Sequence, residues 1–398
     1  SNLWEKQMAK LLEITGKAIS GEWGQDDDTG TGVPVLRTTN FTNEGFVNYK
    51  NVVTRSISKK NIEEKYLRHG DIIIEKSGGS DKQPVGRVIF FEGEENKYLF
   101  NNFTGLLRVQ NPEEWLPKYV FYALYAYYRN GGTRAFENRT TGLHNLQVDN
   151  YVKSVDIPKL SYLRQQHICE TLDHVRDAVA YREQQLSKLD ELIKARFVEM
   201  FGDPKLNPYR FLCNSLSTYI TFLTSGSRGW SQYFTDSGEY FITIKNVKNC
   251  KITLQDVQYV APPDNAEAKR TKVQKNDLLI SITADLGRTG VVTEEIANHG
   301  AYINQHLTCI RLKNELVNPL YVAYYMESDA GKEQFTAKNQ SAVKAGLNFN
   351  AINSLKLMVP PLPLQNQFAD FVAEVDKSKL LAELFAQNAC ILAENRSK

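Results

Sequence analysis

The first residues that could bind an anion lie in a loop rich in glycine and serine. The loop KSGGSDK at 76–82 has a lysine at each end and follows an apolar run typical of a β-strand. Because glycine allows close approach of the backbone, such a loop can present N–H groups to a phosphate. A later loop, TADLGRTG at 283–290, keeps glycine and a cation but lacks the Gly-Gly pair. Both are candidate phosphate contacts, and a plain hairpin turn is the alternative interpretation of each.

A second basic stretch surrounds Thr140, Thr141 and Gly142. Arg129, Arg134, Arg139 and His144 flank it in the first half of the chain. The corresponding stretch around Gly346 has Lys332, Lys338, Lys344 and Asn348. Lysine and arginine neutralise phosphates, and arginine, asparagine and glutamine can pair with base edges. These types together favour DNA binding, although cationic runs are also common on solvated faces.

The loops and the basic stretches give one set of candidate DNA-contacting residues. In the first half of the chain they are Lys76, Ser77, Gly78, Ser80, Lys82, Arg87, Asn102, Arg134, Arg139, Thr141, His144 and Asn145. In the second half they are Thr283, Arg288, Asn304, Gln305, Lys338, Lys344 and Asn348. The amides of Asn102, Asn304 and Gln305 could equally bond local backbone, and the neighbouring His306 has the surroundings of a structural histidine.

The sequence contains no motif typical of a catalytic site. The chain has no Asn-Pro-Pro-Phe-like or Asp-Pro-Pro-Tyr-like tetrad, no G-x-G-x-x-G loop and no P-loop. Asp264 and Glu267 resemble nuclease carboxylates only superficially, because they stand too close in sequence to lie on two separate strands. No histidine or cysteine spacing is typical of a metal site. We therefore predict no catalytic residue, no metal and no cofactor in this chain.

Composition limits the kinds of partner. The 398 residues carry 48 basic and 46 acidic side chains, a net charge of +2, which excludes a nonspecific polycation. No apolar run is long enough to span a membrane, and no signal peptide is visible. The five cysteines are scattered and form no C-x-x-C pair. We expect a cytoplasmic protein with its thiols reduced and no membrane partner.

The elements that must position these residues occur twice. The segment from Gly32 to Phe41 reappears from Gly238 to Val247, and GDIIIE at 70–75 matches NDLLIS at 276–281. SGEW at 20–23 faces SRGW at 227–230, NN at 101–102 matches NQ at 304–305, and PKYVFY at 117–122 matches PLYVAY at 319–324. GL at 142–143 pairs with GL at 346–347, and IPKL at 157–160 with VPPL at 359–362. The matches keep their order, so we predict one domain used twice.

Each copy begins with short β-rich runs, continues into a helix that starts at a proline, and ends before a long amphipathic helix. In the first long helix, positions 168, 172, 175, 179, 182, 186, 189, 193, 196 and 200 form a seam that is apolar apart from two arginines. The C-terminal run shows the same spacing at 368, 371, 375, 378, 382, 385, 389 and 392. This heptad period predicts a coiled coil between the two helices. Two helices that each pack on their own domain are the alternative.

The chain resembles the specificity subunits of type I restriction–modification systems over nearly its whole length. In the first copy the residues that carry the resemblance are GLHNL at 142–146, IPKL at 157–160, Gln165 with Gln166, and LDELIKARFVEMFGDP at 189–204. In the second copy they are GL at 346–347, VPPLPLQ at 359–365, and Gln367. Their order, repeated with a helix after each copy, is what makes the resemblance specific.

The resemblance implies an α+β chain with an internal pseudo-twofold repeat. It implies two target recognition domains, each with a small β-rich sheet and helices, at 1–160 and 204–362. The long helices at 161–203 and 363–398 would form an antiparallel coiled coil that separates them. It further implies recognition of a bipartite sequence in double-stranded DNA, and docking of two methylation subunits and of restriction subunits. S-adenosylmethionine and ATP would then be bound by those partners, and this chain would be no enzyme.

Two other interpretations stay open. The same two domains could form a stand-alone bipartite DNA-binding regulator that needs no partner subunits. A nuclease or methyltransferase with unfamiliar motifs is the second, and the missing cofactor motifs count against it. Complex formation with a methylation subunit distinguishes the specificity subunit from the regulator.

Overall fold

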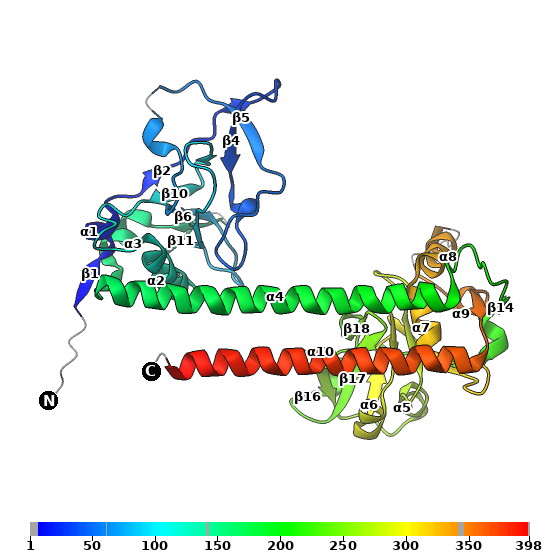
Figure 1. Cartoon of the computed structure of the whole chain (residues 1–398). Helices are drawn as coiled ribbons and strands as arrows, with labels where there is room; N and C mark the ends of the chain where they lie inside the picture. The colour runs from blue at the N-terminus through cyan, green and yellow to red at the C-terminus, as the bar shows by residue number, and fades with distance from the viewer. Residues whose placement is uncertain (1–6, 61, 141–142, 341–345, 397–398) are drawn as a thin grey trace. The chain divides into compact units, whose positions relative to one another are not determined.

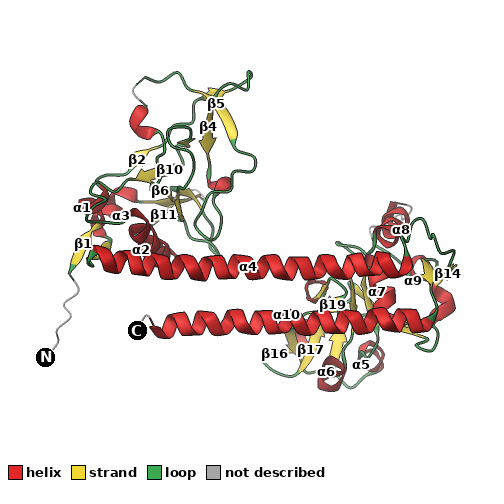
Figure 2. Cartoon of the chain, viewed as in Figure 1, coloured by secondary structure: helices red, strands yellow, loops and turns green. Residues whose placement is uncertain are grey.

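The computed structural model describes residues 7–60, 62–140, 143–340 and 346–396. The chain divides into two compact units, Ser1–Ala178 and Val179–Lys398. Each unit combines small β-sheets with helices, as Figures 1 and 2 show, so the mixed α+β class predicted from the sequence is confirmed. Among the described residues, no helix is long and apolar enough to cross a membrane.

Two four-stranded sheets form most of the first unit. Their orders are β2-β10-β6-β8 and β3-β5-β4-β9, and β11-β12-β7 and β1-β13 form smaller sheets. The strands are β1 (Met8–Lys10), β2 (Ile19–Ser20), β3 (Gln25–Asp26), β4 (Val33–Leu36), β5 (Val53–Ser56), β6 (Ile72–Glu75), β7 (Ser77–Gly78), β8 (Val88–Phe90), β9 (Leu99–Phe100), β10 (Thr104–Leu107), β11 (Glu137–Thr140), β12 (Leu143–Leu146) and β13 (Asp156–Pro158). The helices are α1 (Leu11–Thr15), α2 (Pro117–Arg129), α3 (Val148–Ser154) and the first part of α4 (Tyr162–Phe201).

Strand β6 shows how the core of this unit is built. Its side chains alternate between the two faces of the sheet, as the pleat requires. Ile72 and Ile74 pack with residues of α2, whereas Ile73 packs with Leu36 and Phe100 of the neighbouring sheet. A strand buried on both faces must be apolar throughout, which explains the uninterrupted Ile-Ile-Ile run.

The second unit repeats the same strand orders. Its sheets are β15-β24-β21-β22 and β16-β20-β17-β23, with smaller pairs β14-β25 and β18-β19. The strands are β14 (Leu212–Ser215), β15 (Ile220–Ser225), β16 (Phe234–Thr235), β17 (Glu239–Ile242), β18 (Val247–Lys248), β19 (Lys251–Ile252), β20 (Gln258–Val260), β21 (Leu278–Ser281), β22 (Thr289–Val291), β23 (Ala301–Ile303), β24 (Leu307–Leu312) and β25 (Lys356–Val359). The helices are α5 (Ala266–Thr271), α6 (Glu294–His299), α7 (Pro319–Glu327), α8 (Asp329–Gln340), α9 (Phe349–Asn353), α10 (Leu362–Arg396) and the second part of α4.

A buried ion pair occurs at the same place in each unit. The guanidinium of Arg108 donates two hydrogen bonds of 2.7 Å to the Asp71 carboxylate. In the second unit Arg311 donates two of 2.8 Å to Asp277. Both carboxylates are buried, so each needs its arginine. The duplication predicted from sequence therefore extends to individual polar contacts.

A buried glutamine at the start of each long helix gives a second matched pair. Gln165 Oε1 accepts a 2.8 Å hydrogen bond from the backbone N–H of Leu116, just before α2. Gln365 Oε1 accepts a 2.9 Å bond from the backbone N–H of Asn318, just before α7. Both side chains are fully buried and tie a long helix to the unit that precedes it. They explain why each repeat ends with this residue type.

The structure aligns the two copies differently from three of the sequence matches. Gly21 and Gly226 are equivalent, since a Cβ on either would lie 2.1 Å from a backbone oxygen, that of Asn101 or Asn304. The match of SGEW with SRGW is therefore wrong by two residues. It aligned the two tryptophans, whereas the structure aligns the two glycines. The NN and NQ match is confirmed, because Asn101 and Asn304 donate to Leu36 and Ile242 through equivalent backbone bonds of 3.0 Å.

The other two wrong registers lie near the end of the repeat. Leu146 donates its backbone N–H to Lys76 O, and Leu347 donates to Ile282 O, so these buried leucines correspond. The pairing of the two Gly-Leu dipeptides is therefore wrong. In the same way, the Tyr119 hydroxyl donates to Pro158 O and the Tyr321 hydroxyl to Met358 O, both at 2.8 Å. Pro158 therefore corresponds to Met358, and the match of IPKL with VPPL is wrong by two residues.

Within the second unit, α4 and α10 pack antiparallel. Phe197 and Phe201 contact Phe368 near the start of α10, and Asp190, earlier in α4, pairs with Lys379, later in α10. The buried face of α4 here is centred on Ile193, Phe197 and Phe201.

The heptad seam predicted for these helices is confirmed only in part in this region, where its positions 189, 193 and 200 of α4 and 368, 371 and 375 of α10 are buried or pack against the core. Arg196, also on the predicted seam, lies over the Phe371 ring of α10, but the seam missed Phe197, Phe201 and Val372, all of which are buried. The physical reason is that α4 here packs on α7 as well as on α10, so its buried face is wider than a two-helix seam.

Candidate nucleic-acid interface

The structure brings the predicted glycine loop and the predicted basic stretch into one sheet. Strand β7 of the loop pairs with β12, and β12 pairs with β11. Ser77 lies opposite Asn145, and Gly78 lies opposite His144. On the other side of β12, Arg139 lies opposite His144. Two segments about 60 residues apart in sequence thus share one small surface in the first unit.

Several predicted residues in this sheet serve the loop itself. His144 is largely buried, and its Nδ1 lies 3.3 Å from Glu137 Oε2. Ser80 Oγ accepts a 3.1 Å hydrogen bond from the backbone N–H of Gln83 and so closes the turn. Gly78 has φ +140°, and a Cβ there would lie 2.7 Å from Glu75 Oε1, which explains the glycine. These residues position the loop rather than project from it.

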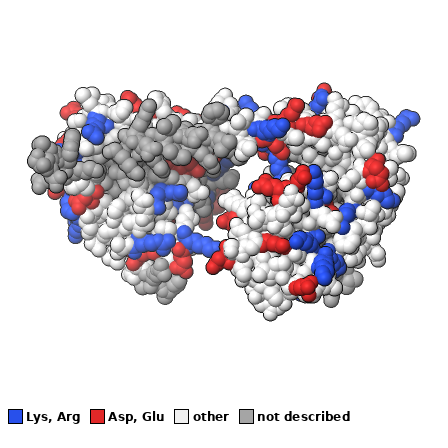
Figure 3. Space-filling model, turned by 90° about the horizontal axis from the view of Figure 1, so that it is seen from below, with Lys and Arg blue, Asp and Glu red and all other residues white. Residues whose placement is uncertain are grey.

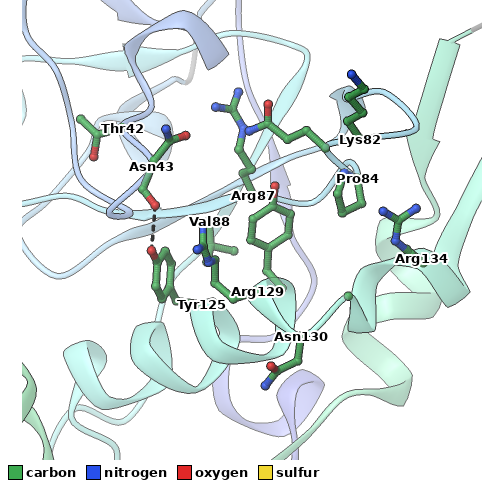
Figure 4. Close-up of a pocket in the computed structure, with 13 residues that line it drawn as sticks. Thr42, Asn43, Lys82, Pro84, Arg87, Val88, Tyr125, Arg129, Asn130 and Arg134 are labelled. Carbon is green, nitrogen blue, oxygen red and sulfur yellow. Dashed lines mark hydrogen bonds between the residues drawn. The ribbon is translucent and has the colours of Figure 1, made fainter. Parts of the chain in front are cut away.

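A cavity of about 580 Å³ lies beside this sheet, and four cations line it. Figure 4 shows Lys82, Arg87, Arg129 and Arg134 placed around it. Lys82 and Arg87 come from the loop between β7 and β8, Arg129 ends α2, and Arg134 lies in a short 3-10 helix at Gly132–Phe136. The lining residues are Thr42, Asn43, Lys82, Gln83, Pro84, Arg87, Val88, Tyr125, Tyr128, Arg129, Asn130, Gly131 and Arg134, and none of them is acidic.

The four cations differ in how firmly the protein already engages them. Arg87 Nε and Nη2 each lie 3.2 Å from the buried Glu75 carboxylate, and Nη2 also donates to Thr38 O. Among the described residues, Arg134 donates to the backbone oxygen of Asp81, at 3.2 Å. Lys82 and Arg129 are exposed and form no ion pair with a described residue. Arg87 is therefore held in place, while the other three can reorient toward an anion.

Tyr125 and Asn43 complete one wall of the cavity and were not predicted from sequence. The Tyr125 hydroxyl donates a 2.7 Å hydrogen bond to Asn43 O, drawn as a dashed line in Figure 4. Burial raises the pKa of the Tyr125 hydroxyl, so it remains a neutral donor at neutral pH. No local pattern identifies Asn43, because only the tertiary fold carries its loop to α2.

Two other predicted residues of the first unit lie outside the cavity. Lys76 is half-buried and donates a 2.8 Å hydrogen bond to Ser20 Oγ. Burial, and then the nearby charge of Lys65, lower the pKa of the Lys76 ammonium. Asn102 is exposed and lines a different cavity of about 290 Å³, together with Trp23 and Lys59. The prediction thus joined residues that the fold separates.

Most predicted residues of the second unit are already engaged by the protein. Asn304 is buried, and its Oδ1 accepts from the backbone N–H of His306. Asn348 caps α9 by accepting a 2.8 Å hydrogen bond from Ala351 N. Thr283 Oγ1 lies 2.7 Å from His306 Nδ1, and Gln305 Nε2 lies 3.1 Å from His306 Nε2. The structural alternative for Asn304 and His306 therefore agrees with their surroundings.

The remaining predicted residues are placed only in part. Arg288 pairs with Asp285, and Lys338 lies on α8. Arg139 is described through its backbone in β11. Thr141 and Lys344 lie outside the described residues. Whether any of the predicted residues contacts DNA stays a prediction.

Charge elsewhere does not form a single large basic surface on the visible face. Figure 3 shows lysine and arginine intermixed with aspartate and glutamate there, as the net charge of +2 leads one to expect. Within the described residues, no group of three or more histidine, cysteine, aspartate or glutamate side chains is arranged to hold a metal ion. The cavity in the first unit is thus a local concentration of positive charge.

Comparison with known proteins gives one family match and several similar structures. Residues 231–386 match the model of the type I restriction modification DNA specificity domain. A 140-residue segment is 23% identical to the type I restriction enzyme EcoBI specificity subunit of Escherichia coli, covering 35% of this chain and 28% of that subunit. The chain thus spans less than a third of the length of that curated relative.

Two solved structures are similar over almost the entire chain. The S subunit of a type I restriction–modification system from M. genitalium superposes with a TM-score of 0.53 at 15% identity, covering 99% of this chain and 96% of that one. A chain from a structure on complex assembly and conformational transition of the type I R-M system has the same TM-score and identity, covering 99% and 95%. At this identity the likeness establishes the fold.

Fold and family match therefore agree with the resemblance found in the sequence: residues 231–386 match a type I restriction modification DNA specificity domain, and the chain is similar in fold to type I S subunits.

Proposed function

We propose that this chain is the DNA-recognition subunit of a type I restriction–modification complex. Each unit reads one part of a bipartite sequence in double-stranded DNA. The chain itself is not catalytic; methylation subunits bind S-adenosylmethionine, and restriction subunits use ATP. The target recognition domains are at 1–160 and 204–362, and the helical segments at 161–203 and 363–398 connect and space them.

The observation that carries this proposal is the duplicated unit. The two copies share their strand orders, their buried Asp-Arg pair and their buried glutamine, and the second copy matches a DNA specificity domain. A repeated module suits a ligand with two similar sites at a fixed separation, and duplex DNA offers such sites. Differences between the copies in their polar loops fit two unlike half-sites.

The long helices supply the spacer and a place for partners. Their antiparallel packing in the second unit supports a coiled coil that holds the two recognition domains at a set distance. Apolar side chains remain exposed on both helices in this region, with Tyr181 58%, Leu192 47% and Leu381 56% exposed. Exposed apolar surface that is rimmed by charge commonly marks a protein-binding face, which supports docking of a methylation subunit here.

A stand-alone bipartite DNA-binding regulator is the second candidate. It would use the same two domains without partner subunits. The exposed apolar positions on the helices favour the subunit, because a lone regulator gains nothing from them.

Co-expression of this chain with its methylation subunit distinguishes the specificity subunit from the stand-alone regulator. We expect the two proteins to elute together in gel filtration, and the complex to bind a target duplex more tightly than this chain alone. Replacing Leu192 by Glu should reduce complex formation, whereas Glu191→Gln, a neighbouring exposed change, should not. Separate elution, with full and sequence-specific DNA affinity in this chain alone, would favour the regulator.

A further inference from the structure

Among the described residues, three of the four cations of the first-unit cavity have no cation at the equivalent position of the second unit, although the surrounding framework is repeated. Arg87 and Arg288 are equivalent, since their backbone oxygens accept 2.8 Å and 2.9 Å bonds from Glu75 N and Ser281 N on the matching strands. The glycine before each arginine also has a positive φ, +100° at Gly86 and +80° at Gly287. These two points align the cavity region of the first unit with the second.

The loop that supplies Lys82 is shorter in the second unit. Between the residues joined by those two backbone bonds lie positions 76–86 in the first unit and 282–287 in the second. That is eleven residues against six, and no lysine occurs among the six. Lys82 therefore has no equivalent.

On the helical side of the cavity, the two described positions of the second unit that correspond to Arg129 and Arg134 hold no cation. A Cβ on Gly86 would meet Thr133, and a Cβ on Gly287 would meet Phe335, so Thr133 and Phe335 are equivalent. Counting four residues back and one forward from each places Gly331 at the position of Arg129 and Thr336 at the position of Arg134. Arg288, the one arginine that is kept, is paired with Asp285.

The residues of the first-unit cavity suit a phosphate. Two exposed arginines and an exposed lysine face a space of about 580 Å³ whose lining holds no carboxylate. Planar guanidinium groups bind phosphate oxygens through paired hydrogen bonds. The Glu75 contact fixes Arg87 at the wall of the cavity and offsets its charge, so the net positive charge comes from Lys82, Arg129 and Arg134.

We infer that this cavity binds backbone phosphates of DNA, and that the first unit consequently supplies a larger share of the salt-dependent affinity than the second. The inference rests on the proposed DNA-recognition function and adds a division of labour between its two halves. Phosphate contacts position a protein on the duplex without reading sequence. The two units would then differ in how much they contribute to affinity while both read bases.

The test uses the full chain in complex with its methylation subunit and a triple variant, Lys82→Gln, Arg129→Gln and Arg134→Gln. Arg87 stays unchanged, because its loss would leave the buried Glu75 carboxylate unpaired. A control triple variant, Lys50→Gln, Lys60→Gln and Lys153→Gln, removes the same charge from exposed positions of the same unit outside the cavity. Binding is measured between about 50 and 200 mM salt on two duplexes, one carrying the motif methylated in cells and one scrambled.

The slope of log affinity against log salt is negative, and we expect the cavity variant to make it less steep by about 0.9 for each phosphate that the protein no longer neutralises, and by more than the control does. The preference for the motif over the scrambled duplex should persist. Equal slopes for the two triple variants would overturn the inference. Loss of the preference for one half of the motif, with an unchanged slope, would also overturn it and assign base reading to the cavity.

A free phosphate ligand is the other source of the same chemistry. Titration of the complex with inorganic pyrophosphate at constant ionic strength distinguishes the two. Saturation at micromolar pyrophosphate that disappears in the cavity variant, without any change in the DNA salt slope, would contradict binding of DNA. If the unmodified complex shows no preference for the motif, the proposed function itself fails, and that outcome is separate from either result for the variants.

Discussion

At the scale of residues, partners distinguish the cations that hold the fold from those free to bind. Arg87 and Arg108 are both engaged by buried carboxylates, whereas Lys82 and Arg129 are exposed without an ion pair among the described residues. Sequence identified Lys82, Arg87 and Arg134, because a glycine loop and clustered cations are visible locally. It could not show that Asn304 and Asn348 bond nearby backbone, since that depends on which N–H groups the fold leaves unpaired.

One pH-dependent contact at this scale involves Asp173 in the first unit. Its Oδ1 accepts a 2.5 Å hydrogen bond from Tyr122, and Lys118 Nζ lies 2.9 Å from its Oδ2. Burial alone would raise the pKa of the carboxyl, but these two donors outweigh it, and the pKa is lowered overall. The contact fastens the first part of α4 to α2.

We predict that Asp173→Asn lowers the free energy of unfolding of the first unit by about 2 kcal/mol at pH 7, the range for hydrogen bonds to a charged group. Because the folded-state pKa is lowered, this stabilisation is present above the unfolded-state value of about 4 and is lost as the pH falls through the folded-state pKa. Calorimetric melts of the full chain at pH 7, 5 and 3 measure the difference. Asp177→Asn is the control, since Asp177 is largely exposed. A difference that grows toward pH 3 would contradict the assignment.

At the scale of elements, the long helices show what periodicity can and cannot predict. Both helices were predicted from their apolar repeat, and both are present as α4 and α10. The residues of the buried face were predicted less well. A period of 3.5 describes contact with one partner helix, but α4 in the second unit also packs on α7, so Phe197 and Phe201 are buried in addition to the seam residues.

This difference predicts unequal costs for neighbouring substitutions. Phe197 is buried among Phe201, Tyr321 and Phe368, with ring centroids 4.9–5.6 Å away. Phe197→Ala should therefore lower the free energy of unfolding of the second unit by about 3–5 kcal/mol. Arg196→Ala should cost only about 1 kcal/mol, because its ion pair with Glu199 and its contact with the Phe371 ring are both partly exposed. Denaturant unfolding measures both free energies, and a larger loss for Arg196→Ala than for Phe197→Ala would contradict this account of the buried face.

At the scale of the whole molecule, the duplication is the feature that sequence revealed most fully. Ordered matches between the halves predicted two copies, and the strand orders repeat from one unit to the other. The exact register was less accessible, because short dipeptide matches such as Gly-Leu recur by chance, while structural equivalence depends on burial and backbone bonding. The difference between the two units at the cationic cavity could not be predicted from sequence for the same reason. It depends on one shortened loop and on a correct alignment of α2 with α7 and α8.

Genome-wide mapping of adenine methylation tests the central claim most directly. It would be carried out in a host that carries this chain with its methylation subunit, and again with this chain deleted. We predict a gapped motif of two parts that disappears on deletion. An identical methylation pattern in both strains, with the complex shown to form, would contradict the proposal that this chain selects the DNA sequence.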